Sequence, residues 1–118
     1  MKILSSTIHG FLDYVVIIAF ALAPTVFGLE GAPAAISYIL AVVHLLLTIL
    51  TAFPLGLIKV IPAIFHGWIE FVVAICLIAI PFVAGFIGAA RNFYVAAGII
   101  IFVVWLITNF ETTESPAA

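Results

Sequence analysis

Two histidine–carboxylate pairs interrupt a sequence that is otherwise almost wholly apolar. His9 and Asp13 form the first pair, and they are four positions apart. His66 and Glu70 form the second pair with the same spacing. Residues four apart share one face of a helix, so each histidine points the same way as its carboxylate. Ionisable groups are costly in hydrocarbon and usually have a partner or a function there, so these four side chains form a candidate site.

The composition predicts an integral membrane protein. Of the 118 residues, 68% are hydrophobic and only 7% are charged, whereas about a quarter of the residues in soluble domains are charged. The lipid bilayer is therefore the expected partner. The formal net charge is -2 and the three basic residues are scattered, so we expect no nucleic-acid binding. The single cysteine, Cys76, has no disulfide partner within the chain, and we expect it to be a small buried apolar residue.

Four apolar runs are long enough to cross a bilayer, which takes about 20 residues. We expect membrane-spanning helices over residues 7–29, 34–52, 62–87 and 93–109. Short segments rich in glycine, proline and charged residues separate these runs and predict turns. Pro24 falls in the last turns of the first helix and should loosen its end. The polar tail at residues 111–118 is expected to be disordered.

The second half of the sequence repeats the first at a spacing of 57 positions, without a gap. The aligned identities include both His-Gly pairs, Pro24 and Pro81, Gly28 and Gly85, Thr51 and Thr108, and Phe53 and Phe110. We therefore expect two two-helix repeats, residues 1–57 and 58–110. Because each repeat crosses the membrane twice, both begin on the same side, and a pseudo-two-fold axis along the membrane normal relates them. The predicted fold class is all-α, an integral membrane four-helix bundle made of two parallel helical hairpins.

The third histidine, His44, is expected at the same depth as the two pairs. A helix rises about 1.5 Å per residue, which places His44 about 12 Å from the surface where the second helix ends, close to the depth of Asp13. The pseudo-two-fold axis places His9 and His66 opposite each other at equal depth. We therefore expect His9, Asp13, His44, His66 and Glu70 to converge in one leaflet.

This cluster has a structural interpretation and three functional ones. In the structural one, the carboxylates accept hydrogen bonds from the histidines and fix helices that have no hydrophobic drive to associate in lipid. In the second, the cluster binds a metal, since imidazole and carboxylate suit zinc, iron, manganese and copper, and a four-helix bundle can point them inward. The candidate metal ligands are His9, Asp13, His44, His66 and Glu70. Their spacing differs from the Glu-x-x-His spacing of di-iron bundles.

The third hypothesis is a b-type haem held by His9 and His66. Gly10 and Gly67 would let the macrocycle approach the backbone, although a carboxylate one turn from each histidine crowds the ring. The fourth is a proton or ion path, because intramembrane histidines and acids are common relay groups. The polar residues stop at mid-depth, so they supply only half of such a path. No nucleotide-binding or hydrolase signature is present, so the sequence names no catalytic residue and leaves open whether the chain is an enzyme.

Each repeat ends its first helix with a proline followed four residues later by a glycine. The first copy is Pro-Thr-Val-Phe-Gly at residues 24–28, and the second is Pro-Phe-Val-Ala-Gly at residues 81–85. With the duplicated hairpin, this pattern resembles the SPW-repeat family of small bacterial membrane proteins. The Ser-Pro-Trp of that family is Ala-Pro-Thr in the first copy and Ile-Pro-Phe in the second. The resemblance covers nearly the whole chain and implies a bacterial four-helix membrane protein, and the family has no agreed activity.

The leading functional prediction is a non-enzymatic accessory or interaction subunit of a bacterial inner membrane, acting in a larger complex or as a homo-oligomer. The alternatives are a cofactor-binding membrane protein, with a metal ion or haem b at His9 and His66, and a proton or ion pathway. Lys2 and Lys59 lie on the side of the termini and Arg91 lies on the other side, so the positive-inside rule predicts cytoplasmic termini.

Overall fold

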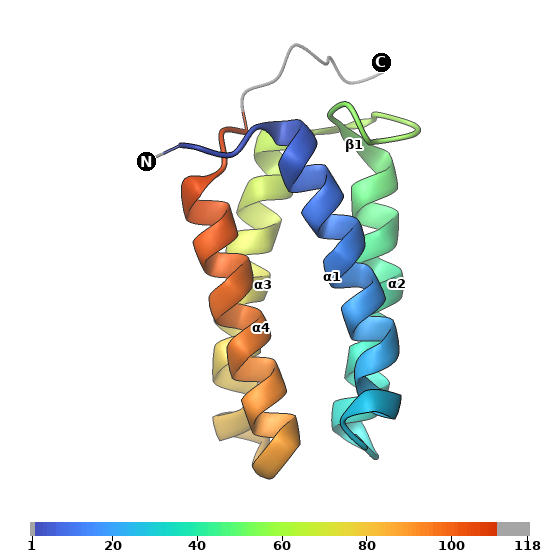
Figure 1. Cartoon of the computed structure of the whole chain (residues 1–118), viewed down its shortest axis with the longest axis vertical. Helices are drawn as coiled ribbons and strands as arrows, with labels where there is room; N and C mark the ends of the chain where they lie inside the picture. Colours follow the sequence, from blue (N-terminus) through green and yellow to red (C-terminus); the bar gives the residue numbers. More distant parts are fainter. Residues whose placement is uncertain (1, 111–118) are drawn as a thin grey trace.

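The chain is a bundle of four helices in the computed structural model, which describes residues 2–110 (Figure 1). The helices are α1 (Ser6–Val26), α2 (Ala32–Leu50), α3 (Ala63–Ala84) and α4 (Gly88–Ile107), and two short strands, β1 (Thr51–Ala52) and β2 (Ile61–Pro62), lie between α2 and α3. All four helices are long and apolar enough to cross a membrane. The prediction of four helices of membrane-spanning length is therefore confirmed. The expected polar tail, residues 111–118, lies outside the described residues.

The outer surface of the bundle is apolar along its length. Large apolar side chains are exposed on every helix, for example Ile18, Val42, Val72 and Ile99. A helix with an apolar exterior is suited to lipid. The prediction of a buried Cys76 is wrong, because this side chain is exposed on α3. In a membrane-spanning helix, apolar character does not distinguish the lipid-facing side from the core, and a small apolar residue fits either one.

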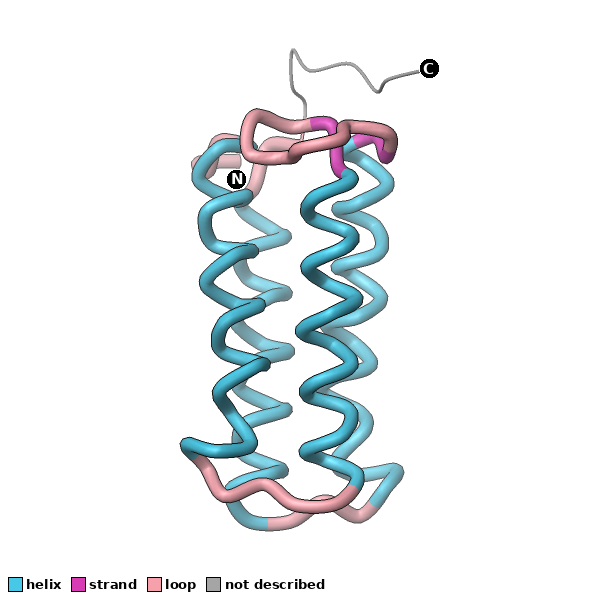
Figure 2. Tube along the Cα trace, turned by 90° about the vertical axis from the view of Figure 1, so that its right-hand side faces the viewer, coloured by secondary structure: helices cyan, strands magenta, loops and turns pink. Residues whose placement is uncertain are grey.

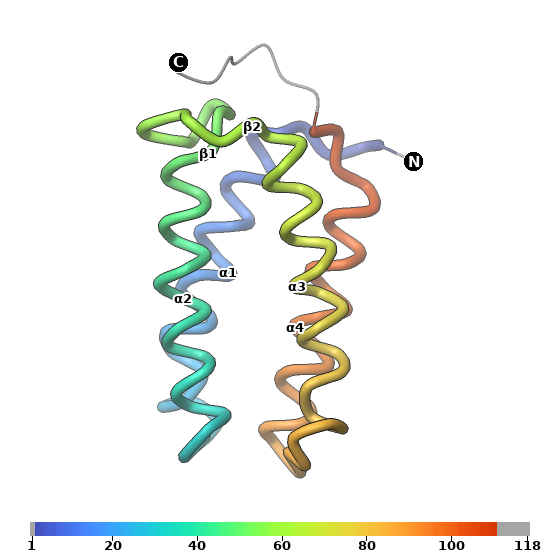
Figure 3. The backbone as a smooth tube through the Cα atoms, turned by 180° about the vertical axis from the view of Figure 1, so that it is seen from behind, coloured from blue at the N-terminus to red at the C-terminus, as the bar shows by residue number. Residues whose placement is uncertain are grey.

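The helices pair as two hairpins, α1 with α2 and α3 with α4 (Figure 2). The two tight turns lie at one end of the bundle, whereas both ends of the described chain and the connection between the hairpins lie at the other (Figure 1). We call this second end the terminal face. From behind, α2 and α3 are joined at the terminal face by β1 and β2 (Figure 3).

A proline lies in the last turn of the first helix of each hairpin, and a glycine with positive φ follows the end of that helix. The backbone N–H of Leu29 donates to the carbonyl of Pro24 at 2.9 Å, and that of Phe86 donates to Pro81 at 2.8 Å. Gly85 follows α3 in the left-handed conformation, with φ of 76°, which glycine adopts without steric cost. Both helices therefore end three residues earlier than expected, at 26 rather than 29 and at 84 rather than 87.

The helix α4 begins at Gly88, five residues before the expected start at 93. The sequence interpretation placed Arg91 in the turn, but this residue already belongs to the helix, and its N–H donates to the carbonyl of Ile87 at 3.4 Å. The first N–H groups of a helix have no partner within it and face the membrane surface, so polar residues are suited to this position.

Short parallel pairings close the terminal face. In β1 and β2, Thr51 pairs with Ile61 and Ala52 with Pro62. An isolated bridge pairs Leu4 with Thr108 in the same parallel sense. These pairings hold the end of each hairpin against the start of the other, and nothing in the hydrophobic pattern of the sequence predicted them.

The half of the bundle away from the terminal face contains the apolar core. Its buried members in this half include Phe20, Ala41, Leu77 and Tyr94. The Tyr94 hydroxyl donates to the carbonyl of Pro33 at 2.5 Å, so this buried polar atom is satisfied. The polar site therefore occupies only the half of the bundle next to the terminal face.

Candidate functional site

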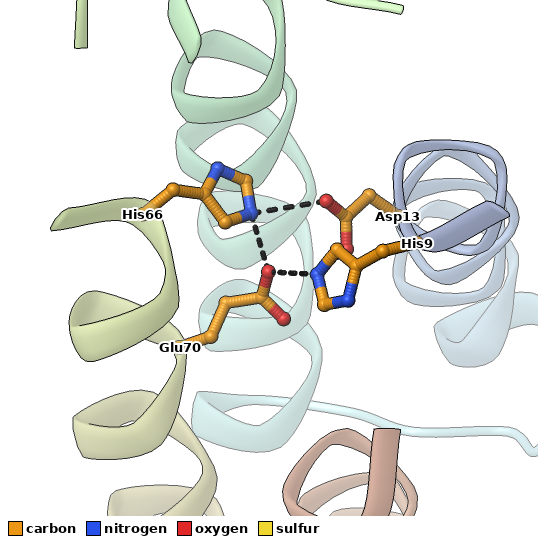
Figure 4. Close-up of side chains that lie close together, drawn as sticks. All are labelled: His9, Asp13, His66 and Glu70. Atoms are coloured by element: carbon orange, nitrogen blue, oxygen red, sulfur yellow. Dashed lines mark hydrogen bonds and ion pairs between the residues drawn. The ribbon is translucent and has the colours of Figure 1, made fainter. Parts of the chain in front are cut away.

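The structure brings together all five side chains that the sequence singled out. His9 and Asp13 come from α1, His66 and Glu70 come from α3, and His44 comes from α2. Each is at least nine-tenths buried, with relative exposures of 2% for His9 and Asp13, 8% for His44, 1% for His66 and 3% for Glu70. Figure 4 shows four of them, with the α1 pair facing the α3 pair.

The Nε2 atoms of two histidines meet both carboxylates. His9 Nε2 lies 2.7 Å from Glu70 Oε1 and 3.2 Å from Asp13 Oδ1. His66 Nε2 lies 3.0 Å from Asp13 Oδ2 and also contacts Glu70 Oε1 (Figure 4). One ligand atom from each of these residues lies within 4.8 Å of the other three. We call these four residues, His9, Asp13, His66 and Glu70, the tetrad.

A threonine at the end of α4 fixes the proton of His9. The Thr108 hydroxyl donates its only hydrogen to the carbonyl of Val104 at 2.5 Å. Its oxygen can then only accept a hydrogen bond from His9 Nδ1, which lies 2.8 Å away. Nδ1 of His9 therefore carries a hydrogen, and its Nε2 is directed at the carboxylates.

Thr51, at the end of α2, fixes the proton of His66 in the same way. The Thr51 hydroxyl donates to the carbonyl of Leu47 at 2.6 Å and accepts from His66 Nδ1 at 2.7 Å. Both tetrad histidines are thus held by a hydrogen bond at Nδ1, and both present Nε2 to the centre. This is the arrangement in which proteins commonly hold metal-binding histidines, whose second ring nitrogen donates to a nearby acceptor.

The centre of the tetrad requires either protons or a cation. A neutral histidine that carries its hydrogen on Nδ1 has a lone pair on Nε2, and a carboxylate oxygen opposite it also has only lone pairs. A proton in each histidine–carboxylate pair removes this repulsion and leaves the tetrad neutral. One divalent cation between two neutral histidines and two carboxylates does the same. The tetrad can therefore hold about two protons or one divalent ion at equal net charge.

Two aromatic rings cover the histidines from the terminal face. A side chain at Gly10 would overlap the ring of Phe53, and one at Gly67 would meet the ring of Phe110. The Phe110 ring lies 4.9 Å from His9, and the Phe53 ring lies 5.7 Å from His66, both measured between centroids. The two glycines thus admit rings that cover the site, rather than the macrocycle that the sequence interpretation considered.

His44 lies beside the tetrad without belonging to it. Its Nε2 is 3.6 Å from Asp13 Oδ1, which is too long for a hydrogen bond. Its ring centroid lies 6.2 Å from that of His66. The predicted set of five therefore divides into four converging residues and one neighbour.

The geometry favours an ion over a haem. The rings of His9 and His66 lie edge to face with centroids 5.7 Å apart, and Glu70 Oε1 contacts Nε2 of both histidines. A macrocycle coordinated by these two atoms would have to occupy the space that the carboxylates fill, whereas a bare metal ion would bind to the carboxylates as well.

The sequence interpretation did not assign a role to the residues that support the histidines. Thr51 and Thr108 hold the imidazole rings, and Phe53 and Phe110 cover them. All four recur at the spacing of 57 positions, close to the ends of α2 and α4. This recurrence of a polar residue at a helix end was the available signal.

Replacing Thr51 or Thr108 by valine should lower the free energy of unfolding of the metal-free protein by about 1–2 kcal/mol, because a buried Nδ1–H loses its acceptor. Thr48→Val is the matched control, since the Thr48 hydroxyl is buried and has no hydrogen-bond partner among the described residues. Its unfolding free energy should stay within about 0.5 kcal/mol of wild type. Reversible unfolding in mixed detergent micelles, followed by circular dichroism, measures all three. Equal losses in all three variants would contradict the role assigned to Thr51 and Thr108.

Likeness to known proteins does not identify this site. Searches of protein-family models, curated proteins and solved structures found no match to the chain. The interpretation of the site therefore rests on its own geometry and chemistry.

Proposed function

We propose that the chain is an integral membrane protein that binds one divalent transition-metal ion through the tetrad. The observation that carries this proposal is the convergence of two Nε2 atoms and two carboxylates, with both histidines held at Nδ1 by threonine. Histidine and carboxylate ligands from facing helices are a common way to build a metal site inside a four-helix bundle.

The donor set favours zinc, manganese or iron. Imidazole and carboxylate are ligands of intermediate and hard character, which suit Zn²⁺, Mn²⁺ and Fe²⁺. The softer Cu⁺ prefers thiolate or thioether, and the single cysteine, Cys76, is exposed on the outside of α3. The tetrad itself has no sulfur ligand.

Charge balance also supports a divalent ion. An uncompensated charge inside a bilayer is strongly unfavourable. Two carboxylates and one divalent ion sum to zero, so the loaded tetrad carries no net charge. A trivalent ion would leave one positive charge in surroundings where buried side chains away from the tetrad are mostly apolar.

The hydrogen-bond network gives less support to a transmembrane proton path. The network joins Thr108, His9, Glu70, His66 and Thr51, and both threonines lie at helix ends on the terminal face. It therefore runs across the bundle rather than along it. The apolar core occupies the remaining half of the bundle.

We further propose that the chain is a duplicated hairpin with parallel repeats, residues 1–57 and 58–110, of the kind found in the SPW-repeat family. Equivalent contacts recur 57 positions apart in support of this proposal. They are Thr51 to His66 and Thr108 to His9, the Phe53 ring against His66 and the Phe110 ring against His9, and the pairings Thr51–Ile61 and Thr108–Leu4. Each hairpin thus provides the threonine and the aromatic ring for the histidine of the other.

The proposed location is a bacterial inner membrane with the termini in the cytoplasm. Lys2 and Lys59 belong to segments at the terminal face, and Arg91 lies at the opposite end in the first turn of α4. Basic residues are more frequent on the cytoplasmic side. The apolar outer surface also leaves room for the chain to act as a subunit of a larger membrane complex.

Purified protein supplied with equal concentrations of Mn²⁺, Fe²⁺, Co²⁺ and Zn²⁺ should retain about one ion per chain after desalting. The double variant His9→Gln/His66→Gln should retain less than about a tenth of that amount, because both imidazole ligands are lost. His44→Gln is the matched histidine control and should retain the ion. Elemental mass spectrometry measures the metal, and circular dichroism checks the fold.

Equal metal content in the wild type and the double variant would contradict the tetrad as the binding site. Glu70→Gln provides a second variant if the double variant does not fold. It keeps the size and polarity of the side chain and should weaken metal affinity by about tenfold or more.

Metal binding near neutral pH should release about two protons per ion, because the ion replaces one proton in each histidine–carboxylate pair. Calorimetric titrations in buffers of different ionisation enthalpy measure this number. The Glu70→Gln variant lacks one of the two carboxylates and should release about one proton. Release near zero in the wild type would mean that the ion binds to groups that carry no proton, which contradicts the site.

A further inference from the structure

The polarity around the tetrad is one-sided. Two buried side-chain atoms beside the tetrad, His44 Nε2 and Thr48 Oγ1, have no hydrogen-bond partner among the described residues. Both belong to α2, and Thr48 is completely buried. At the corresponding positions of the second hairpin, 57 residues later, α4 has Ile101 and Trp105. The face of α2 beside the tetrad therefore carries a histidine and a threonine where the corresponding positions of α4 carry apolar side chains.

The unpartnered nitrogen of His44 faces the tetrad. His44 is 8% exposed, and its Nε2 is 3.6 Å from Asp13 Oδ1. Thr48 is one helical turn from His44 on the same face of α2. A buried polar atom without a partner is unfavourable, most of all in a membrane, where no bulk water can satisfy it. Two such atoms on the α2 side of the tetrad point to a small polar ligand between α2 and the tetrad.

We propose that the metal ion takes an additional, exchangeable ligand on the side of His44, and that this ligand is a water or hydroxide replaceable by a small anion. This inference rests on the proposed metal-binding function. The tetrad offers four ligand residues, whereas manganese, iron and cobalt sites with oxygen and nitrogen donors commonly have up to six ligands. The His44 Nε2–H donates a hydrogen bond to the added ligand, and the Thr48 hydroxyl lies one helical turn further along the same face of α2.

An exchangeable ligand changes the class of the site. Structural metal sites are closed by protein ligands, whereas sites that bind or transform small molecules keep one position open. The asymmetry between the hairpins provides that position on one side only. The two hairpins thus have the same histidine at the metal, whereas they have different residues at the positions beside the added ligand.

The test uses cobalt and azide. Co²⁺ reports its ligands through its visible absorption spectrum, and azide is a small anion that replaces water on such ions. Titrating Co²⁺-loaded protein with azide should shift the spectrum to a saturating end point. In His44→Leu, the Co²⁺ content should stay at about one per chain, while the azide dissociation constant should rise by about tenfold or more, because the hydrogen bond to the bound anion is lost.

Matched variants isolate the role of the α2 side. Ile101→Leu changes the corresponding position of the other hairpin and should leave the azide dissociation constant within about twofold. Thr48→Val keeps the shape of the threonine side chain and should weaken azide binding while Co²⁺ stays bound. It also provides an independent test if His44→Leu does not fold.

The possible failures are distinguishable. Stoichiometric Co²⁺ without any response to azide would overturn the exchangeable ligand and leave the proposed metal site intact. Equal azide affinity in wild type, His44→Leu and Thr48→Val would overturn the assignment of the ligand to the α2 side. Failure of the wild-type protein to bind Co²⁺ would overturn both the metal site and this inference.

Discussion

The structure depends on a constraint that hydrocarbon imposes, namely that each buried polar atom needs a partner within the protein or bound to it. At the terminal face this constraint is met by two threonine hydroxyls, each of which donates to its own helix and accepts from a histidine of the other hairpin. These hydrogen bonds link the hairpins and fix the hydrogen on Nδ1 of both rings. They leave Nε2 of both rings directed at two carboxylates, which creates the need for protons or a metal ion.

Contacts at both ends of the terminal face hold the two histidines of the tetrad in place. Gly10 and Gly67 allow aromatic rings to lie over the histidines, and parallel pairings at β1–β2 and at Leu4–Thr108 hold each hairpin end in place. A ligand set held on rigid helices with a second layer of hydrogen bonds is what precise metal binding requires. The apolar core then fills the other half of the bundle, so the polar groups are confined to one depth.

Much of this could be predicted from the sequence, because bilayer thickness and helical periodicity are strong constraints. The number of helices follows from the apolar run lengths, and the i, i+4 spacing places each histidine with its carboxylate. Depth and symmetry arguments gave the convergence of the two pairs with His44. Other features depend on tertiary contacts: the Thr51 and Thr108 hydrogen bonds, the short strands and the separation of His44 from the tetrad. Hydropathy also could not place Cys76, because lipid-facing and core positions are both apolar.

X-ray absorption spectroscopy of the zinc-loaded protein tests the central claim most directly, because it reports the atoms around the metal. The account predicts nitrogen and oxygen ligands at about 2.0–2.2 Å and outer-shell scattering from two imidazole rings. Sulfur among the ligands, or the absence of imidazole scattering, would contradict the assignment of the tetrad as the metal site.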